Sequence, residues 1–249
     1  MPTRQTLAYV ETFWVERLGC SAQDLHRPGV TLLPNGGNLA AYRGAFLLRW
    51  DAACIFTVPA SLLAPTAAAM HGRHIDHVFD AAFLADLFAA HLDRVVGPAF
   101  QGCADASDFR PAEGHGTRVL ALEEDTALER LAVGCGPEAW EHSAIARGQQ
   151  QQQPIFGCFA GTELVAAGTL QAWGPHLRSV GIVTHPAYRG RGYGRAVVAT
   201  MTAYALDGGY IPQYQTLMRN TGSLGIAHAL GYQQYATTIA VRLADLLET

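Results

Sequence analysis

The sequence predicts an α/β (α+β) fold, and three features of the C-terminal half lead to this prediction. Residues 155–160 and 164–173 are apolar runs separated by the turn residues Gly161 and Thr162, a pattern typical of a β-hairpin. Residues 178–184 form a β-branched run that ends at a glycine-rich turn. Beyond the turn, apolar residues recur with helical spacing over 191–207. Strands and helices thus alternate along this half.

The same signals place the other elements of this half. A strand at 117–122 precedes a helix at 125–133, which Gly134 and Gly136 are expected to end. Pro137 begins a second helix that runs to about Arg147. A strand at 213–217, a helix at 221–230 and one long strand at 232–242 complete the order. The glutamines at 149–153 are expected to form a solvated loop.

The N-terminal half predicts a second α+β region. Residues 7–18 form an amphipathic helix, and residues 80–96 form another that ends at Gly97-Pro98. Between them, short strands are expected at 30–33, 39–42, 45–50 and 54–58. Residues 101–116 are rich in Gly, Asp and Pro and are expected to link two domains, 1–115 and 116–249.

Composition narrows the class of protein. A net charge of −4 argues against a nucleic-acid partner, because such binding depends on clustered positive charge. The first ten residues contain no sustained apolar segment, so neither a signal peptide nor a membrane anchor is expected there. The five cysteines are scattered, with no C-x-x-C pair, which is typical of reduced thiols. We therefore expect a cytoplasmic protein that binds neither nucleic acid nor membrane.

The most informative segment is V-T-H-P-A-Y-R-G-R-G-Y-G-R at 183–195. A strand here feeds a glycine-rich turn that opens a helix. The first amides of a helix lack internal partners, and the positive end of the helix dipole lies behind them. Glycines leave these amides accessible, and three arginines add charge suited to phosphate oxygens. The turn is therefore predicted to bind a diphosphate.

Two other phosphate motifs do not fit this turn. A Walker A loop requires a lysine, and the sequence contains none, because all 17 of its Lys and Arg residues are arginine. A dinucleotide turn has the spacing G-x-G-x-x-G, whereas Gly190, Gly192 and Gly194 are one residue short of it. The acidic ribose partner would fall near Asp207, at a helix end rather than a strand end.

A different pattern, [Q/R]-x-x-G-x-[G/A], is met by Arg189, Gly192 and Gly194. Downstream, Asn220 and Ser223 fit N-x-x-S, and residues 230–232 read L-G-Y. With these motifs, residues 116–249 resemble the GNAT superfamily of acyl-CoA-dependent N-acetyltransferases. The resemblance implies a mixed, mostly antiparallel sheet flanked by helices, with residues 1–115 as an additional N-terminal region. It also implies acetyl-CoA as cosubstrate and an amine as acceptor.

The resemblance further implies a cofactor site. The strand before the turn and the strand at 213–217 would splay apart, with the pantetheine arm between them. A backbone N–H near Val183 or Thr184 would stabilise charge on the thioester oxygen. The implied cofactor-binding residues are Ile182, Val183, Thr184, Arg189, Gly190, Arg191, Gly192, Tyr193, Gly194, Arg195, Asn220 and Ser223.

The catalytic residues are less clearly indicated. Many family members carry a tyrosine four residues after the serine, as an acid for the leaving thiolate, and this position is Ala227 here. His228 or Tyr214 could replace that tyrosine only by facing the thiol. Candidate bases are His142, Glu141 and His185, which are titratable and expected near the acceptor.

Alternatives to an acetyltransferase stay open at this stage. The missing tyrosine allows a non-catalytic acyl-CoA-binding or regulatory module, and a nucleotide-dependent enzyme is a third hypothesis. Residues 1–115 could be a degenerate acetyltransferase-like half or a cap over the acceptor site. The pattern H-x-x-H-x-x-H at 71–77 could supply imidazole ligands to a metal ion. On a helix, however, the three rings would spread over about 120° around the axis, so no metal site is predicted. The sequence identifies neither the acceptor nor the oligomeric state.

Overall fold

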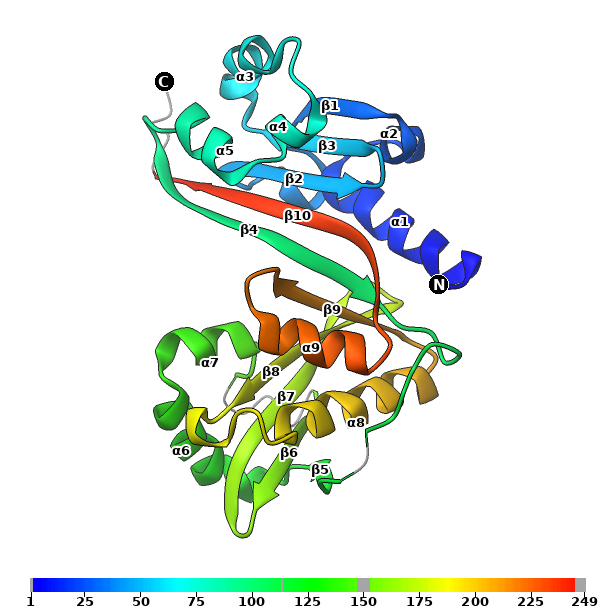
Figure 1. Ribbon diagram of the computed structural model, residues 1–249, viewed down its shortest axis with the longest axis vertical. Helices are drawn as coiled ribbons and strands as arrows, with labels where there is room; N and C mark the ends of the chain where they lie inside the picture. The colour runs from blue at the N-terminus through cyan, green and yellow to red at the C-terminus, as the bar shows by residue number, and fades with distance from the viewer. Residues whose placement is uncertain (1, 113, 147–152, 245–249) are drawn as a thin grey trace. The chain divides into compact units, whose positions relative to one another are not determined.

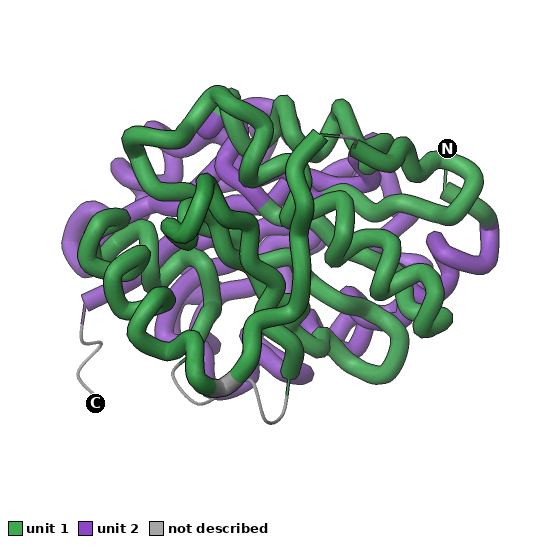
Figure 2. The backbone as a smooth tube through the Cα atoms, turned by 90° about the horizontal axis from the view of Figure 1, so that it is seen from below, with its two compact units in different colours: residues 1–3, 102–215, 221–233 green, residues 4–101, 216–220, 234–249 purple. Residues whose placement is uncertain are grey.

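The computed structural model describes residues 2–112, 114–146 and 153–244, and it contains two compact units (Figure 2). Unit 1 takes residues 1–3, 102–215 and 221–233. Unit 2 takes residues 4–101, 216–220 and 234–249. The division does not follow the order of the sequence, because the C-terminal strand belongs mainly to the unit that contains most of the N-terminal half.

Among the residues that the structure describes, unit 1 holds five strands and four α-helices. Figure 1 labels these elements. Its strands are β5 (Thr117–Val119), β6 (Ile155–Ala160), β7 (Glu163–Trp173), β8 (Leu177–Thr184) and β9 (Ile211–Leu217). They lie in the order β9-β8-β7-β6-β5, in which β8 and β9 are parallel and the other neighbours are antiparallel. The helices are α6 (Asp125–Cys135), α7 (Pro137–Ser143), α8 (Tyr193–Asp207) and α9 (Thr221–Ala229), with 3-10 turns η3 (Leu122–Glu124) and η5 (Pro186–Tyr188).

Helices cover both faces of this sheet. On one face, Ala167 of β7 and Val183 of β8 are buried in a cluster with Leu128 and Leu131 of α6. On the other, a Cβ at Gly168 would lie 2.6 Å from Cε of Met201 in α8, so the missing side chain lets α8 pack closely on β7. Successive residues of a strand point to opposite faces, which explains why Ala167 and Gly168 meet different helices.

Unit 2 is a second α+β unit. Its strands are β1 (Gly29–Pro34), β2 (Gly44–Trp50), β3 (Ala53–Val58), β4 (Leu92–Cys103) and β10 (Gln233–Leu243), in the order β1-β3-β2-β10-β4. Its helices are α1 (Arg4–Leu18), α2 (Ala22–His26), α3 (Leu63–Met70), α4 (Ile75–Val78) and α5 (Ala81–Leu87), with 3-10 turns η1 (Gly37–Leu39) and η2 (Ala60–Leu62). Apolar residues of β2, β3 and β10 form one buried cluster with Leu84 and Phe88.

The helix predicted at 80–96 is wrong beyond its first half. Asp80 does cap a helix, since its Oδ1 accepts a hydrogen bond from the Phe83 N–H at 2.8 Å. That helix ends at Leu87, however, and residues 92–103 form β4, which neighbours β10. Pairing with β10, which lies far away in sequence, outweighs the local helical preference.

The strand predicted at 39–42 is also wrong. Residues 37–39 form η1, and the loop that follows is closed by the side chain of Asn35. The Asn35 Nδ2 donates to the carbonyls of Tyr42 and Gly44 at 2.6 and 2.9 Å. These hydrogen bonds satisfy two backbone carbonyls of the loop, which therefore do not require pairing with a strand.

Two helix ends in unit 1 differ from the prediction. Gly134 lies inside α6 rather than at its end, and the ring of His185 occupies the space where its Cβ would stand. Helix α7 ends at Ser143 instead of Arg147, where Ala144 adopts a left-handed φ of 60°. Glutamines 149–152 of the predicted loop lie outside the described residues.

Within the described ranges, no helix has the length and apolar character needed to span a membrane.

Candidate functional site

The glycine-rich turn of unit 1 leads from the end of β8 into α8, as the sequence predicts. Gly192 is the N-cap residue, with a φ of 90°, and no side-chain hydrogen bond caps the helix there. The Ala196 N–H donates to the Gly192 carbonyl at 3.0 Å, so intrahelical bonding starts one turn in. The amides of residues 193–195 therefore stand at the open, positive end of a helix of 15 residues.

A close contact between Gly194 and Thr184 fixes the start of this helix. A Cβ on Gly194 would lie 2.7 Å from Oγ1 of Thr184, inside normal contact distance. Because Gly194 has no side chain, the first turn of α8 can rest against the last residue of β8. The exposed amides thus begin directly at the end of the strand.

The charge around the turn is mainly positive. Arg189, Arg191 and Arg195 are exposed, and the first turn of α8 contains no acidic residue. The Arg189 Nε donates to the Thr184 carbonyl at 3.2 Å, which folds this side chain back over the turn. The Arg191 guanidinium lies 5.4 Å from the centre of the Tyr188 ring. Such guanidinium groups suit phosphate oxygens.

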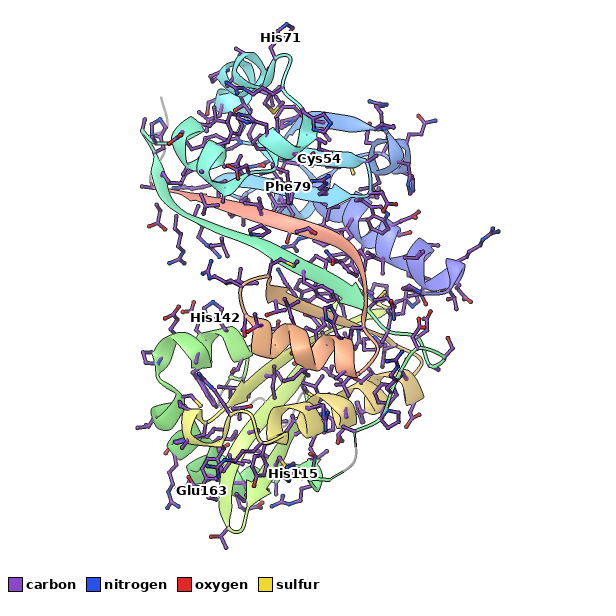
Figure 3. The ribbon with its side chains drawn as sticks, in the orientation of Figure 1. Cys54, His71, Phe79, His115, His142 and Glu163 are labelled. Atoms are coloured by element: carbon purple, nitrogen blue, oxygen red, sulfur yellow. The ribbon has the colours of Figure 1, made fainter. Side chains whose placement is uncertain are left out.

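Two contacts tie the turn to other parts of unit 1. The Tyr188 hydroxyl donates to Oε2 of Glu163, the first residue of β7, at 2.7 Å. That hydrogen bond raises the pKa of Tyr188. On the other side, Nε2 of His115 lies 2.8 Å from the Arg191 carbonyl, and its ring stacks on Tyr193. His115 is labelled in Figure 3.

His115 was missed by the sequence prediction. It lies just before β5, in the segment predicted to be a linker, between Gly114 and Gly116. A single histidine between glycines matches no motif, and only the folded chain brings it to the turn. No signal in the sequence could have singled it out.

Strands β8 and β9 separate as the resemblance implies. Their parallel pairing covers only Leu177–Ser179 of β8 and Ile211–Gln213 of β9. Beyond Ser179, β8 continues to Thr184 without a β9 partner in this register. Ile182, Val183 and Thr184 lie on this part of β8, just before the turn. Its backbone edge can therefore pair with an extended ligand.

Ser223 lies on the first turn of α9, and its hydroxyl oxygen is 3.0 Å from that of Tyr214 in β9. Burial raises the pKa of Tyr214 to about 12, and the bond with Ser223 lowers it in part. Ala227 is fully buried one helical turn after Ser223. Asn220 is exposed and directly precedes α9, while His228 is exposed near its end.

The three predicted base candidates lie on two different segments. Glu141 and His142 are both exposed on α7, and Nδ1 of His142 lies 2.6 Å from the Glu138 carbonyl (Figure 3). His185 follows β8, where its Nδ1 accepts from the Ala187 N–H at 3.3 Å and its ring packs against Gly134. His185 thus has a capping and packing role, whereas the side chains on α7 reach solvent.

His74 and His77 of unit 2 have local partners. His74 caps α4 by accepting from the Asp76 N–H at 3.4 Å, and His77 contacts Arg73 at 2.7 Å. Across the described part of the chain, no group of three or more His, Cys, Asp or Glu residues is placed to hold a metal ion.

Comparison with known proteins gives one family match. Residues 122–232 match the model of the acetyltransferase (GNAT) family. A comparison with curated proteins gives no match.

Solved structures of this family have a similar fold. A GNAT-family protein from Novosphingobium aromaticivorans is 23% identical, with a TM-score of 0.50, over 62% of this chain and 66% of that one. An acetyltransferase from the GNAT family of Colwellia psychrerythraea is 11% identical, with a TM-score of 0.55, over 98% of both chains. A Salmonella typhimurium protein solved with its cofactor acetyl-CoA is 14% identical, with a TM-score of 0.41, over 55% of this chain and 98% of that one. At these identities the likeness to the Novosphingobium and Colwellia proteins concerns the fold alone. The chain spans just under two thirds of the Novosphingobium protein.

Proposed function

We propose, from the premise that residues 122–232 form a GNAT acetyltransferase domain, that the protein moves an acetyl group from acetyl-CoA to the amine of a small molecule or peptide. One observation carries the proposal. The uncapped start of α8, with Gly192 as N-cap and three exposed arginines around it, fits the diphosphate of coenzyme A.

The unpaired edge of β8 supports the orientation of the cosubstrate. With the diphosphate at the turn, the pantetheine arm would run along residues 180–184, on the backbone edge that β9 does not pair with. The thioester would then lie deeper in unit 1, beside the strand that precedes the turn. A backbone N–H near Val183 or Thr184 would then stabilise negative charge on the carbonyl oxygen.

The reaction itself needs little covalent help, because a thioester is already activated. The neutral amine attacks the carbonyl carbon, a C–N bond forms, and the C–S bond breaks. The nitrogen gives up a proton, and the thiolate of coenzyme A leaves and takes up a proton. Holding the two substrates together is expected to supply most of the acceleration.

A side chain on α7 is the best-supported base. Nδ1 of His142 points to a backbone carbonyl, which accepts a hydrogen bond and so favours the tautomer that leaves Nε2 as a proton acceptor. Glu141 is equally exposed, whereas the Nδ1 of His185 is already used as a cap. We propose His142 and Glu141 ahead of His185. Replacing the true base by Gln should lower kcat and leave the Kd of acetyl-CoA unchanged.

Calorimetric titration with acetyl-CoA tests the proposal directly. We expect saturable binding that Gly192→Trp abolishes, because an indole would fill the space over the amides. Absence of binding by the wild type, or equal binding by Gly192→Trp, contradicts the proposed function.

Release of coenzyme A thiol across a panel of amines then tests catalysis. Turnover with any amine supports the acetyltransferase. Tight binding without turnover on every amine favours a non-catalytic acyl-CoA-binding module, the alternative that the buried Ala227 supports.

A further inference from the structure

We propose that His115 is a positioning residue for the diphosphate turn, which it holds in the conformation that presents the α8 amides. The inference rests on the proposed function, since it concerns the affinity of the same turn for the diphosphate of acetyl-CoA. It adds a residue that lies outside the glycine-rich motif and about 75 positions before it in the sequence.

The imidazole of His115 meets three consecutive residues of the turn. Its Nε2 lies 2.8 Å from the Arg191 carbonyl, so Nε2 carries the proton and donates. A Cβ on Gly192 would stand 3.4 Å from Cδ2 of the ring. The ring also stacks on Tyr193, with centroids 4.1 Å apart and an interplanar angle of 23°.

These contacts restrain the turn in two directions. The hydrogen bond acts within the plane of the imidazole, and the stack acts perpendicular to it. The Arg191 carbonyl and the Tyr193 ring flank Gly192, the N-cap residue. Rotation of the peptide group between Arg191 and Gly192 would break the hydrogen bond, and a shift of the Tyr193 backbone would disturb the stack. The orientation of the first α8 amides therefore depends on His115.

The turn needs such an external restraint because of its glycines. Gly190 and Gly192 have φ values of 75° and 90°, and glycine has more conformations to lose than any other residue. Ordering a free turn at the moment of binding would weaken the affinity, whereas a turn that is already ordered binds more tightly. Tyr188 and Glu163 restrain the η5 side of the turn, and His115 restrains the helix side.

Three variants separate positioning from a general effect on folding. His115→Ala removes both contacts, and His115→Gln keeps a donor but loses the aromatic ring. His176→Ala is the matched control, because His176 is an exposed histidine just before the opposite end of β8. The probes are acetyl-CoA, by calorimetric titration, and inorganic pyrophosphate, by competition against acetyl-CoA. The thermal midpoint of each variant is recorded alongside.

We expect His115→Ala to weaken acetyl-CoA and pyrophosphate by the same factor, about tenfold, because both ligands use the ordered turn. His115→Gln should recover part of this loss, and His176→Ala should change neither affinity. The thermal midpoint should stay within about 2 °C of the wild type, because His115 is exposed.

Each other outcome overturns the inference. Unchanged affinities in His115→Ala overturn it alone and leave the proposed function standing. A loss confined to acetyl-CoA, with pyrophosphate unaffected, places His115 against another part of the cofactor. A parallel fall in the thermal midpoint assigns it a general structural role. Absence of acetyl-CoA binding by the wild type removes the proposed function and this inference together.

Discussion

The hydroxyl groups of Tyr214 and Ser223 lie 3.0 Å apart and join β9 to the first turn of α9. Tyr214 is 1% exposed, so its phenol is withdrawn from water and its pKa rises to about 12. The phenol therefore stays protonated and neutral through the neutral pH range. It reaches α9 one turn before Ala227, the position where related enzymes often carry a tyrosine.

We predict that Tyr214 makes the fold sensitive to alkali. Its pKa is about 12 in the folded chain and near 10 when unfolded, so the folded state binds more protons between these values. The protonated phenol contributes its full stabilisation below about pH 10. As the pH rises towards 12, the free energy of unfolding should fall by roughly 2–3 kcal/mol. Urea unfolding at a series of pH values measures this slope.

Tyr214→Phe should reduce that alkaline loss and lower stability at pH 7 by about 1 kcal/mol, because the hydrogen bond between Tyr214 and Ser223 is lost. Part of the decrease in stability with rising pH should remain, since burial also raises the pKa of Tyr232. Tyr204→Phe is the control, because Tyr204 is 50% exposed. A Tyr214→Phe variant with the full wild-type slope would contradict the prediction.

Sequence reasoning succeeded where local chemistry decides the structure. The turn at Gly192 needs a positive φ and an open helix start, and both requirements are visible as glycines after a β-branched strand. The short β8–β9 pairing could be predicted only from the resemblance to a family, because no residue pattern in either strand indicates where the pairing stops.

It failed where distant segments meet. Gly97 resembles a helix terminator in sequence, yet a Cβ there would lie 2.8 Å from the Thr238 carbonyl, so the glycine permits close approach of β4 and β10. His115 resembles a linker residue, yet its ring rests on Tyr193. In both cases the decisive partner is more than 70 residues away, and periodicity and propensity carry no information at that range.

The contact between Gly194 and Thr184 predicts a pair of compensating substitutions. Gly194→Ala should destabilise the fold by about 1–3 kcal/mol, because its Cβ would overlap Oγ1 of Thr184 at 2.7 Å. It should also weaken acetyl-CoA binding, since α8 must move from the end of β8. Adding Thr184→Ala removes the overlapping atom and leaves ordinary contacts of 3.5 Å to Cδ1 of Ile226 and 3.9 Å to Cβ of residue 184. The double variant should thus regain stability and affinity, measured by denaturant unfolding and calorimetry, and persistent loss in it would refute the steric explanation.

Gly192→Ala should separate backbone strain from blockage of the amides. Gly192 and Gly174 have similar φ values, 90° and 76°, so alanine at either should cost about 1–2 kcal/mol of stability. Gly174 lies in the β7–β8 turn, at the opposite end of β8 from the diphosphate turn, and Gly174→Ala should leave the Kd of acetyl-CoA unchanged. Only Gly192→Ala should raise it. Equal Kd values in the two variants would mean that the α8 start does not carry the diphosphate.

Arg195 is expected to lower the stability of the ligand-free protein and to strengthen acetyl-CoA binding. A positive side chain in the first turn of a helix opposes the helix dipole, so Arg195 disfavours α8 in the absence of ligand. A bound diphosphate would reverse the sign of this interaction. Arg195→Ala should therefore leave the thermal midpoint equal to or slightly above that of the wild type, while acetyl-CoA binds several-fold more weakly.

Salt provides the measurement that ties this effect to charge. Raising the ionic strength from 0.05 to 0.5 M should weaken acetyl-CoA binding less in Arg195→Ala than in the wild type, because one screened attraction is already gone. Arg130→Ala, at an exposed position on α6, keeps the three arginines of the turn and should retain the wild-type salt dependence. If Arg195→Ala kept the wild-type salt dependence as well, the Arg195 guanidinium would not act on the phosphates. Its destabilisation of α8 would then not be offset by tighter acetyl-CoA binding.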